Sequence, residues 1–292
     1  MRLSIWPHAG QPYSEVLDVA RHAAETGWDG VYVADHFMPN AGTGGVHDPV
    51  LECASLVAAL GALVPRVRIG SLVFGNTYRH PAVLANIAAT VDHLSGGRFT
   101  LGVGAGWQIN EHDQYGIELP PVKQRLDRFV EALRVLHGLL RQPTTTIDGR
   151  YYQLTDAVCE PKPVQDPLPI LIGGGGERRM LRIVARYADV WNTWGTPKLI
   201  AHKSAVLDGF CAEVGRDPKA IARTAQALTV VDGPVPEGLP MPVIGGSAQR
   251  LADTVAEYRA IGLDELIVPD RMLGKGAGRL KAMDVIAGIV AG

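Results

Sequence analysis

Residues 14–36, SEVLDVARHAAETGWDGVYVADH, contain the unit whose repetition indicates the fold. Apolar residues such as Val16 and Ala20 recur at helical spacing, so the first half predicts an amphipathic helix that ends at Gly27. The apolar run at 30–34 predicts a short buried strand. The unit is therefore a helix, a tight turn, a buried strand and a polar strand end.

The same alternation continues along the whole chain. Strands are predicted at 3–6, 30–34, 67–73, 99–103, 170–172, 190–193, 225–231 and 265–268. Helices are predicted at 14–26, 48–64, 81–95, 121–142, 177–188, 198–214, 247–261 and 278–290. In the helix at 48–64, Asp48 is expected as the N-cap and Pro49 at the first helical position.

Short buried strands separated by amphipathic helices form right-handed parallel units. Eight such units without a break in composition predict an α/β fold, a (β/α)8 TIM barrel, with residues 1–292 as a single domain. A doubly wound open sheet is the alternative. One segment interrupts the alternation, because residues 144–154 predict a β-hairpin that turns at Asp148-Gly149 and is inserted in the barrel.

The composition argues against several function classes. Lys and Arg total 28 and Asp and Glu total 30, so the net charge of -2 gives no overall field that would attract a nucleic acid. No apolar stretch reaches the roughly 20 residues that cross a bilayer, and no signal-peptide segment is visible. Three distant cysteines form no CxxC pair. We expect a cytoplasmic protein without membrane or nucleic-acid partners.

In a TIM barrel, catalytic residues lie at the C-terminal ends of the strands. Asp35 and His36 follow the second predicted strand and are the acid–base candidates, since an imidazole titrates near neutral pH and a neighbouring carboxylate can fix its state. A metal site that combines these two with His8 and Glu111 is a weaker alternative, because neither His-x-His nor HExxH occurs there. We therefore expect no metal.

Two strand ends are rich in glycine. Four glycines at 173–176 precede a predicted helix, a pattern typical of phosphate binding, and Arg178 and Arg179 add positive charge. The segment 102–107, GVGAGW, would let a flat ring lie against the backbone. Neither segment fits GxGxxG, and GxxxxGK[ST] is absent, which argues against Rossmann and Walker sites.

Together these segments resemble the luciferase-like monooxygenase superfamily and, within it, the coenzyme F420-dependent oxidoreductases. The matching segments are GWDGVYVADHF (27–37), RVRIGSLV (66–73), YRHPA (78–82), DHLSGGR (92–98), LGVGAGW (101–107), PILIGGGG (169–176) and ADVWN (188–192). The resemblance implies a barrel, usually a homodimer, with a deazaflavin ring at its C-terminal mouth. Members that bind flavin mononucleotide (FMN) share much of the pattern, so an FMN-dependent monooxygenase that uses reduced flavin and O2 is the alternative.

The resemblance also implies roles for individual residues. Asp35 and His36 match positions that line the ring and the transfer site. The other matches are a bulge behind the ring, often with a cis non-proline peptide bond (Ser71, Leu72, Val73), contacts to the ring or tail (Gly104, Ala105, Gly106, Trp107) and a phosphate loop (Gly174, Gly175, Gly176).

The implied reaction is hydride transfer between deazaflavin C5 and an electron-poor C=C, C=O or C=N bond of a small organic substrate. We expect His36, oriented by Asp35, to donate or relay the proton. The family's sugar-phosphate dehydrogenases use a Glu as proton donor, and Trp107 occupies that position here, so we do not expect glucose-6-phosphate dehydrogenase activity.

The substrate pocket is expected to suit an apolar or aromatic acceptor. We predict that loops around 37–47, 107–120 and 232–246 build it. Its expected lining is Met38, Trp107, Glu111 and Trp194.

Overall fold

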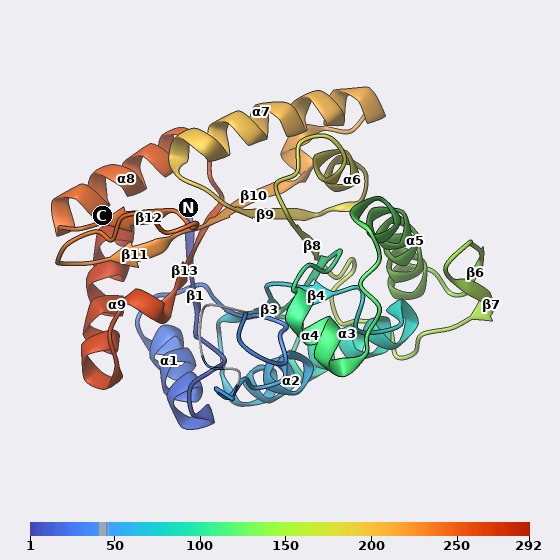
Figure 1. Cartoon of the computed structure of the whole chain (residues 1–292), viewed down its shortest axis with the longest axis horizontal. Coiled ribbons are helices and arrows are strands. Elements are labelled where there is room, and N and C mark those ends of the chain that lie inside the picture. Colours follow the sequence, from blue (N-terminus) through green and yellow to red (C-terminus); the bar gives the residue numbers. More distant parts are fainter. Residues whose placement is uncertain (41–44, 46) are drawn as a thin grey trace.

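The computed structural model describes residues 1–40, 45 and 47–292. Eight parallel strands close into a barrel (Figure 1), and the additional pairing of β3 with β5 joins the two ends of the sheet. The barrel strands are β1 (Arg2–Trp6), β2 (Gly30–Val33), β3 (Arg68–Ser71), β5 (Phe99–Gly104), β8 (Ile170–Gly173), β9 (Val190–Trp194), β10 (Ala222–Gln226) and β13 (Glu265–Pro269). The predicted (β/α)8 barrel is therefore confirmed, and the open sheet is wrong.

A ring of helices surrounds the barrel (Figure 1). It consists of α1 (Tyr13–Glu25), α2 (Cys53–Leu63), α3 (Pro81–Ser95), α5 (Val122–Arg141), α6 (Met180–Tyr187), α7 (Pro197–Val214), α8 (Ala248–Ala260) and α9 (Gly276–Ala291). Short helices also follow two strands: α4 (Ile109–Tyr115) after β5 and the 3-10 helix η2 (Asp270–Met272) after β13; a further 3-10 helix, η1 (Pro218–Ala220), precedes β10. Within the described residues, no helix is both long and apolar enough to cross a membrane.

The hydrophobic core lies between the strands and the surrounding helices. Val31 and Val33 of β2 belong to it, whereas Tyr32 between them belongs to a second cluster with Leu171 and Ile267. Successive side chains of a strand point to opposite faces, so this second cluster lies inside the barrel. A Cβ on Gly70 would lie 2.4 Å from the Tyr32 ring, which explains why the neighbouring strand carries glycine there.

The start of α2 differs from the prediction. The helix begins at Cys53, and its N-cap is Glu52, whose carboxylate accepts the N–H groups of Ala54 and Ser55. Asp48 is not the cap and instead accepts the N–H of Gly45. Residues 49–52 form no helical turn, and Leu51 donates its N–H to the carbonyl of Ala9 at 2.9 Å.

Two predicted strands are each divided in the structure. The apolar run at 225–231 spans the end of β10 and all of β11 (Leu228–Val230), which pairs with β12 (Val243–Gly245) outside the barrel. The run at 67–73 is interrupted after Ser71, and the sheet resumes as β4 (Phe74–Gly75). An apolar run reports burial, and it therefore does not reveal where a strand changes its partner.

The predicted hairpin is confirmed. Its strands β6 (Thr145–Asp148) and β7 (Gln153–Ala157) pair antiparallel. The turn is wider than the expected Asp-Gly turn because Asp148 pairs with Gln153, which leaves four residues between the strands. The carboxylate of Glu131 on α5 accepts three N–H groups of this turn, from residues 150–152, so the open turn keeps its hydrogen bonds.

Candidate active site

The C-terminal ends of the barrel strands surround a cleft with about 1240 Å³ of empty space. Many of the site residues predicted from the sequence line it: Asp35, His36, Leu72, Val73, Gly104, Ala105, Gly106, Trp107, Gly174 and Trp194. These residues come from the ends of five strands, β2, β3, β5, β8 and β9. The closed barrel therefore brings them to one place, as the strand-end rule predicts.

The floor of the cleft is a bulge between β3 and β4. The Leu72–Val73 peptide bond is cis. Ser71 does not line the cleft, because its buried Oγ donates to the carbonyl of Gly102 (2.8 Å) and accepts the Gly102 N–H (3.0 Å). A Cβ on Gly102 would lie 1.9 Å from the Ser71 carbonyl oxygen, so only glycine allows this approach. The bulge presents Val73 as an apolar surface toward the cleft.

Asp35 is buried in an ion pair. Arg79 donates to both of its carboxylate oxygens, at 2.6 and 2.9 Å, and the N–H of Gly75 donates at 2.9 Å. Burial raises the pKa of Asp35, and these hydrogen bonds oppose the rise. Arg79 also donates to Glu52, the N-cap of α2. Asp35 therefore connects β2, the bulge and α2, and it does not contact the His36 ring through a hydrogen bond.

Glu111 holds His36 in place. Its Oε1 lies 2.8 Å from Nδ1 of His36 and accepts the hydroxyl of Tyr78, and its Oε2 accepts the N–H of Phe37 at 2.8 Å. Burial alone would raise the pKa of Glu111, but the hydrogen bonds from His36, Tyr78 and Phe37 lower it. Burial and Glu111 raise the pKa of Tyr78, so its hydroxyl remains a donor.

This arrangement determines which ring nitrogen of His36 carries the proton. An ionised Glu111 accepts only, so Nδ1 must donate to it. The other nitrogen, Nε2, has no hydrogen bond to a described residue, and the ring lines the cleft. Glu111 itself is fully buried behind His36 and lines neither the cleft nor the neighbouring cavity described below. Sequence reasoning placed it in the substrate pocket.

In the glycine loop after β8, Gly174 donates its N–H to the carbonyl of Asn192 (2.9 Å), and the next two N–H groups have no hydrogen bond with the described residues. The carbonyl of Gly174 accepts the Trp191 indole (2.8 Å), and that of Gly175 accepts Nζ of Lys203 (2.6 Å). In a trans peptide the next N–H points opposite to the carbonyl, so the N–H groups of Gly175 and Gly176 point away from these donors. These two glycines do not line the cleft.

The helix after this loop starts later than expected. Helix α6 begins at Met180 rather than at 177, because residues 177–179 form a turn. Arg179, expected to add positive charge to the loop, forms an ion pair with Asp127 at 2.5 Å. The loop therefore offers N–H groups from its own turn, and the helix N-terminus lies farther along the chain.

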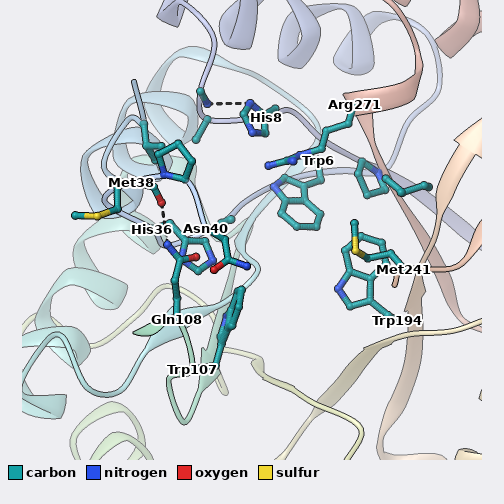
Figure 2. A pocket seen from close by; sticks show the side chains of 17 residues that line it. Trp6, His8, His36, Met38, Asn40, Trp107, Gln108, Trp194, Met241 and Arg271 are labelled. Atoms are coloured by element: carbon teal, nitrogen blue, oxygen red, sulfur yellow. Dashed lines mark hydrogen bonds between the residues drawn. The ribbon is translucent and has the colours of Figure 1, made fainter. Parts of the chain in front are cut away.

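A second cavity of about 950 Å³ adjoins the cleft (Figure 2). The two share Trp6, His36, Trp107 and Trp194. The remaining lining is mostly apolar and includes Met38, Pro39, Val50, Leu228, Met241 and Pro269, with His8, Asn40, Gln108 and Arg271 as polar members. Met38, Trp107 and Trp194 therefore line the same cavity beside the cleft. All three predicted loops contribute, although residues 41–44 and 46 of the first lie outside the described residues.

Sequence reasoning missed several lining residues. Tyr78, which lines the cleft, and Arg79, which pairs with Asp35 behind it, lie in a segment that carries the resemblance, but nothing in their pattern assigned them a role. Trp6 is the last residue of β1, so the strand-end rule could have found it. Gln226 is the last residue of β10, but the predicted strand ran on to 231 and hid this end. Arg271 follows β13, and the same rule applies to it.

Comparison with known proteins places this geometry in a family. A family model described as luciferase-like monooxygenase matches residues 1–235. An F420-dependent glucose-6-phosphate dehydrogenase of Amycolatopsis mediterranei (strain U-32) is 37% identical over 175 residues, which are 60% of this chain and 50% of that protein. The chain thus spans about half the length of this relative.

Solved structures share the fold over almost the whole chain. An F420-dependent secondary alcohol dehydrogenase in complex with an F420-acetone adduct has a TM-score of 0.85 at 20% identity, with 99% of both chains covered. EDTA monooxygenase from Chelativorans sp. BNC1 has a TM-score of 0.82 at 15% identity, with 99% of this chain and 92% of that chain covered. Since the family model covers most of the chain, the protein belongs to the luciferase-like monooxygenase family.

Proposed function

We propose that this protein is an F420-dependent oxidoreductase that transfers a hydride between deazaflavin C5 and an electron-poor C=C, C=O or C=N bond of a small organic substrate. The observation that carries the proposal is the position of His36 on the boundary between the cleft and the apolar cavity. A group there can contact both a bound cofactor and a substrate. The F420-dependent dehydrogenase relative supports this choice of cofactor.

The cleft fits a flat heterocycle with a phosphate-bearing tail. Val73 offers an apolar surface for one face of a ring, and glycine at 104 leaves room beside it, because a Cβ there would lie 2.8 Å from Val73. Gln226 lines the cleft, and its buried Oε1 has no hydrogen-bond partner among the described residues, so it can accept an N–H of a bound ring. The N–H groups of Gly175 and Gly176 lie outside the cleft, next to Gly174 of its lining, and would suit a phosphate of the tail.

The bound deazaflavin would supply the hydride. His36 would supply the accompanying proton from Nε2 to the substrate atom, so that one hydride and one proton together saturate the double bond. In the opposite direction Nε2 would accept that proton. Glu111 would stabilise the His36 ring while the ring is charged, since the Glu111 carboxylate accepts the Nδ1–H hydrogen bond whether or not Nε2 is protonated. Glu111 therefore takes the orienting role that sequence reasoning assigned to Asp35.

The aromatic lining disfavours a sugar phosphate as substrate. Trp107 lies at the glycine-spaced position where the family's sugar-phosphate dehydrogenases have Glu, and more than half of its surface is exposed toward the cavities. A side chain without a dissociable proton cannot act as that donor. We therefore propose an apolar or aromatic acceptor.

Paired fluorescence titrations of the purified protein test the cofactor. We expect micromolar or tighter binding of F420, about -8 kcal/mol, and clearly weaker binding of FMN. Preferential binding of FMN would favour an oxygen-using monooxygenase instead, and binding of neither would remove the proposal. For the proton role, His36→Asn should lower turnover with F420 affinity unchanged. Full turnover in that variant would exclude His36 as the proton donor.

A further inference from the structure

The second cavity carries positive charge at one end. Among the described residues that line it, Arg271 is a guanidinium and His8 and His36 are imidazoles, whereas no Asp or Glu lines it. His36 lies at the boundary with the cleft, on the opposite side of the cavity from Arg271 in Figure 2. His8 lies beside Arg271 in the same view. The cavity therefore has one end that is polar and cationic.

The acidic neighbour of Arg271, Asp270, has its hydrogen bonds and its ion pair with other groups. Asp270 accepts the N–H of His8 (2.9 Å) and Nε2 of Gln11 (3.0 Å), and it forms an ion pair with Arg279 at 3.1 Å. Arg271 has no side-chain hydrogen bond or ion pair with the described residues. Figure 2 shows its guanidinium extending toward Trp6. Its positive charge is therefore available to a ligand in the cavity.

His8 adds a neutral donor next to this charge. Burial, with the charges of Arg271 and Arg279, lowers the pKa of His8 to about 4, so the ring is neutral at pH 7. Its Nδ1 accepts the N–H of Gly10 at 3.1 Å, and the single ring proton must therefore be on Nε2. A neutral N–H donor beside a guanidinium is an arrangement that suits the two oxygens of a carboxylate.

The rest of the cavity is suited to a flat apolar body. The ring centroids of Trp6 and Trp194 lie 5.8 Å apart, with the ring planes at 52°. The rings of Trp107 and His36 pack edge to face, with their centroids 5.5 Å apart. Beside the three tryptophans the lining is mostly apolar, and Nε2 of Gln108 already donates to the carbonyl of Met38. A polyhydroxylated ligand would lose hydrogen bonds to water on entering, whereas an aromatic one would not.

We propose that the second cavity binds a substrate that consists of a flat apolar body and one carboxylate, with the carboxylate held by Arg271 and His8 and the body enclosed by Trp6, Trp107 and Trp194. The reducible bond of such a substrate would lie at the end of the body near His36. The inference names the substrate class of the proposed oxidoreductase and, for the reaction, rests on that proposal.

Calorimetric titration of the protein without cofactor tests the carboxylate site. The probes are cinnamate and cinnamamide, which have the same flat skeleton and differ in the charge. We expect cinnamate to bind at least ~10-fold more tightly than cinnamamide, because a charge-assisted pair with Arg271 is available to cinnamate alone. In Arg271→Gln the preference should fall to within about twofold while cinnamamide affinity is unchanged. Arg271→Lys should keep part of the preference for cinnamate.

The matched control is Arg186→Gln, which removes one arginine charge from the exposed end of α6 and should keep the full preference. Equal affinity of the native protein for both probes would overturn the inference, as would an unchanged preference in Arg271→Gln. Tighter binding of glucose 6-phosphate than of cinnamate would contradict the proposal that the cavity takes a flat apolar body.

The two proposals fail separately. A carboxylate preference in a protein that binds neither F420 nor FMN would leave this inference standing and remove the proposed function. F420 binding without any carboxylate preference would remove this inference alone.

Discussion

The His36 imidazole is held by a carboxylate that lies 75 positions later in the chain, rather than by the adjacent Asp35. Adjacent residues at the end of a strand point to opposite faces, so Asp35 and His36 cannot easily share a hydrogen bond. Asp35 points toward Arg79 and the bulge, and His36 points toward Glu111 and the cavities. Asp35 is thus a structural residue, and His36 is the one available for chemistry.

Replacing Glu111 should change catalysis more than cofactor binding. In Glu111→Gln the carboxylate charge that stabilises a protonated His36 is lost, so we expect kcat to fall about 100-fold. Steady-state kinetics at pH 7 measure kcat, and F420 affinity should stay within about twofold.

The control for this substitution is Glu118→Gln, an exposed carboxylate that follows α4. It should leave kcat unchanged. A Glu111→Gln enzyme with native kcat would show that the carboxylate only packs behind the ring.

His8 should make stability depend on pH. Its pKa is about 4 in the folded protein and near 6.5 when unfolded, so between these values the unfolded chain binds a proton that the folded protein does not. Stability is therefore full above pH 6.5 and is lost as the pH falls toward 4. After allowance for its partial exposure, we expect a contribution of about 1–2 kcal/mol.

Denaturant unfolding at pH 7 and pH 4.5 measures this contribution. His8→Asn keeps an acceptor for the Gly10 N–H but does not titrate, so its free energy of unfolding should fall less over this range than that of the native protein. Parallel pH dependence of the two proteins would mean that His8 is not desolvated.

At the scale of the element, the bulge after β3 depends on the strand beside it. Gly102→Ala would place a Cβ 1.9 Å from the Ser71 carbonyl, so β3 and β5 must separate locally. We expect the free energy of unfolding to fall by at least 2 kcal/mol, and F420 affinity to fall because Val73 moves. Thermal unfolding and the fluorescence titration measure the two effects.

Helix α7 supplies a matched glycine. A Cβ on Gly209 meets nothing within 4 Å, and Gly209→Ala should therefore stabilise the protein by about 0.5–1 kcal/mol with cofactor binding unchanged. Equal effects of the two substitutions would show that β3 and β5 tolerate a wider spacing.

How far the sequence predicts an element depends on its length and neighbours. Helix α3 agrees with its predicted bounds, because fifteen residues show a clear period and Pro81 and Gly96 mark its ends. Helix α4 has seven residues, too few for a period to be visible, and its Glu111 was therefore not expected behind His36. The positions of strand ends follow from the pattern, whereas the directions of side chains at those ends depend on packing between distant segments.

At the scale of the whole molecule, the barrel depends on its last strand. β13 pairs with β1 over five residues on one side and with β10 on the other, and Glu265 accepts the Ser4 hydroxyl. A chain that ends at Asp264 would expose the edges of both neighbours. We expect it to show no cooperative unfolding transition by circular dichroism or calorimetry.

Removal of Gly292 alone is the control and should leave the transition unchanged. A sharp transition in the chain that ends at Asp264 would mean that seven strands form a stable sheet without closure.

The same pairing has a consequence during synthesis on the ribosome. The partner of Arg2 in β13 is Glu265, 263 positions later in the chain, so β1 emerges long before this neighbour. At about 5–20 residues per second, β1 waits roughly 10 to 50 seconds for this partner. Over that time one edge of the nascent sheet is unpaired. The half-made protein is thus the form most exposed to aggregation, and the form on which a chaperone would act.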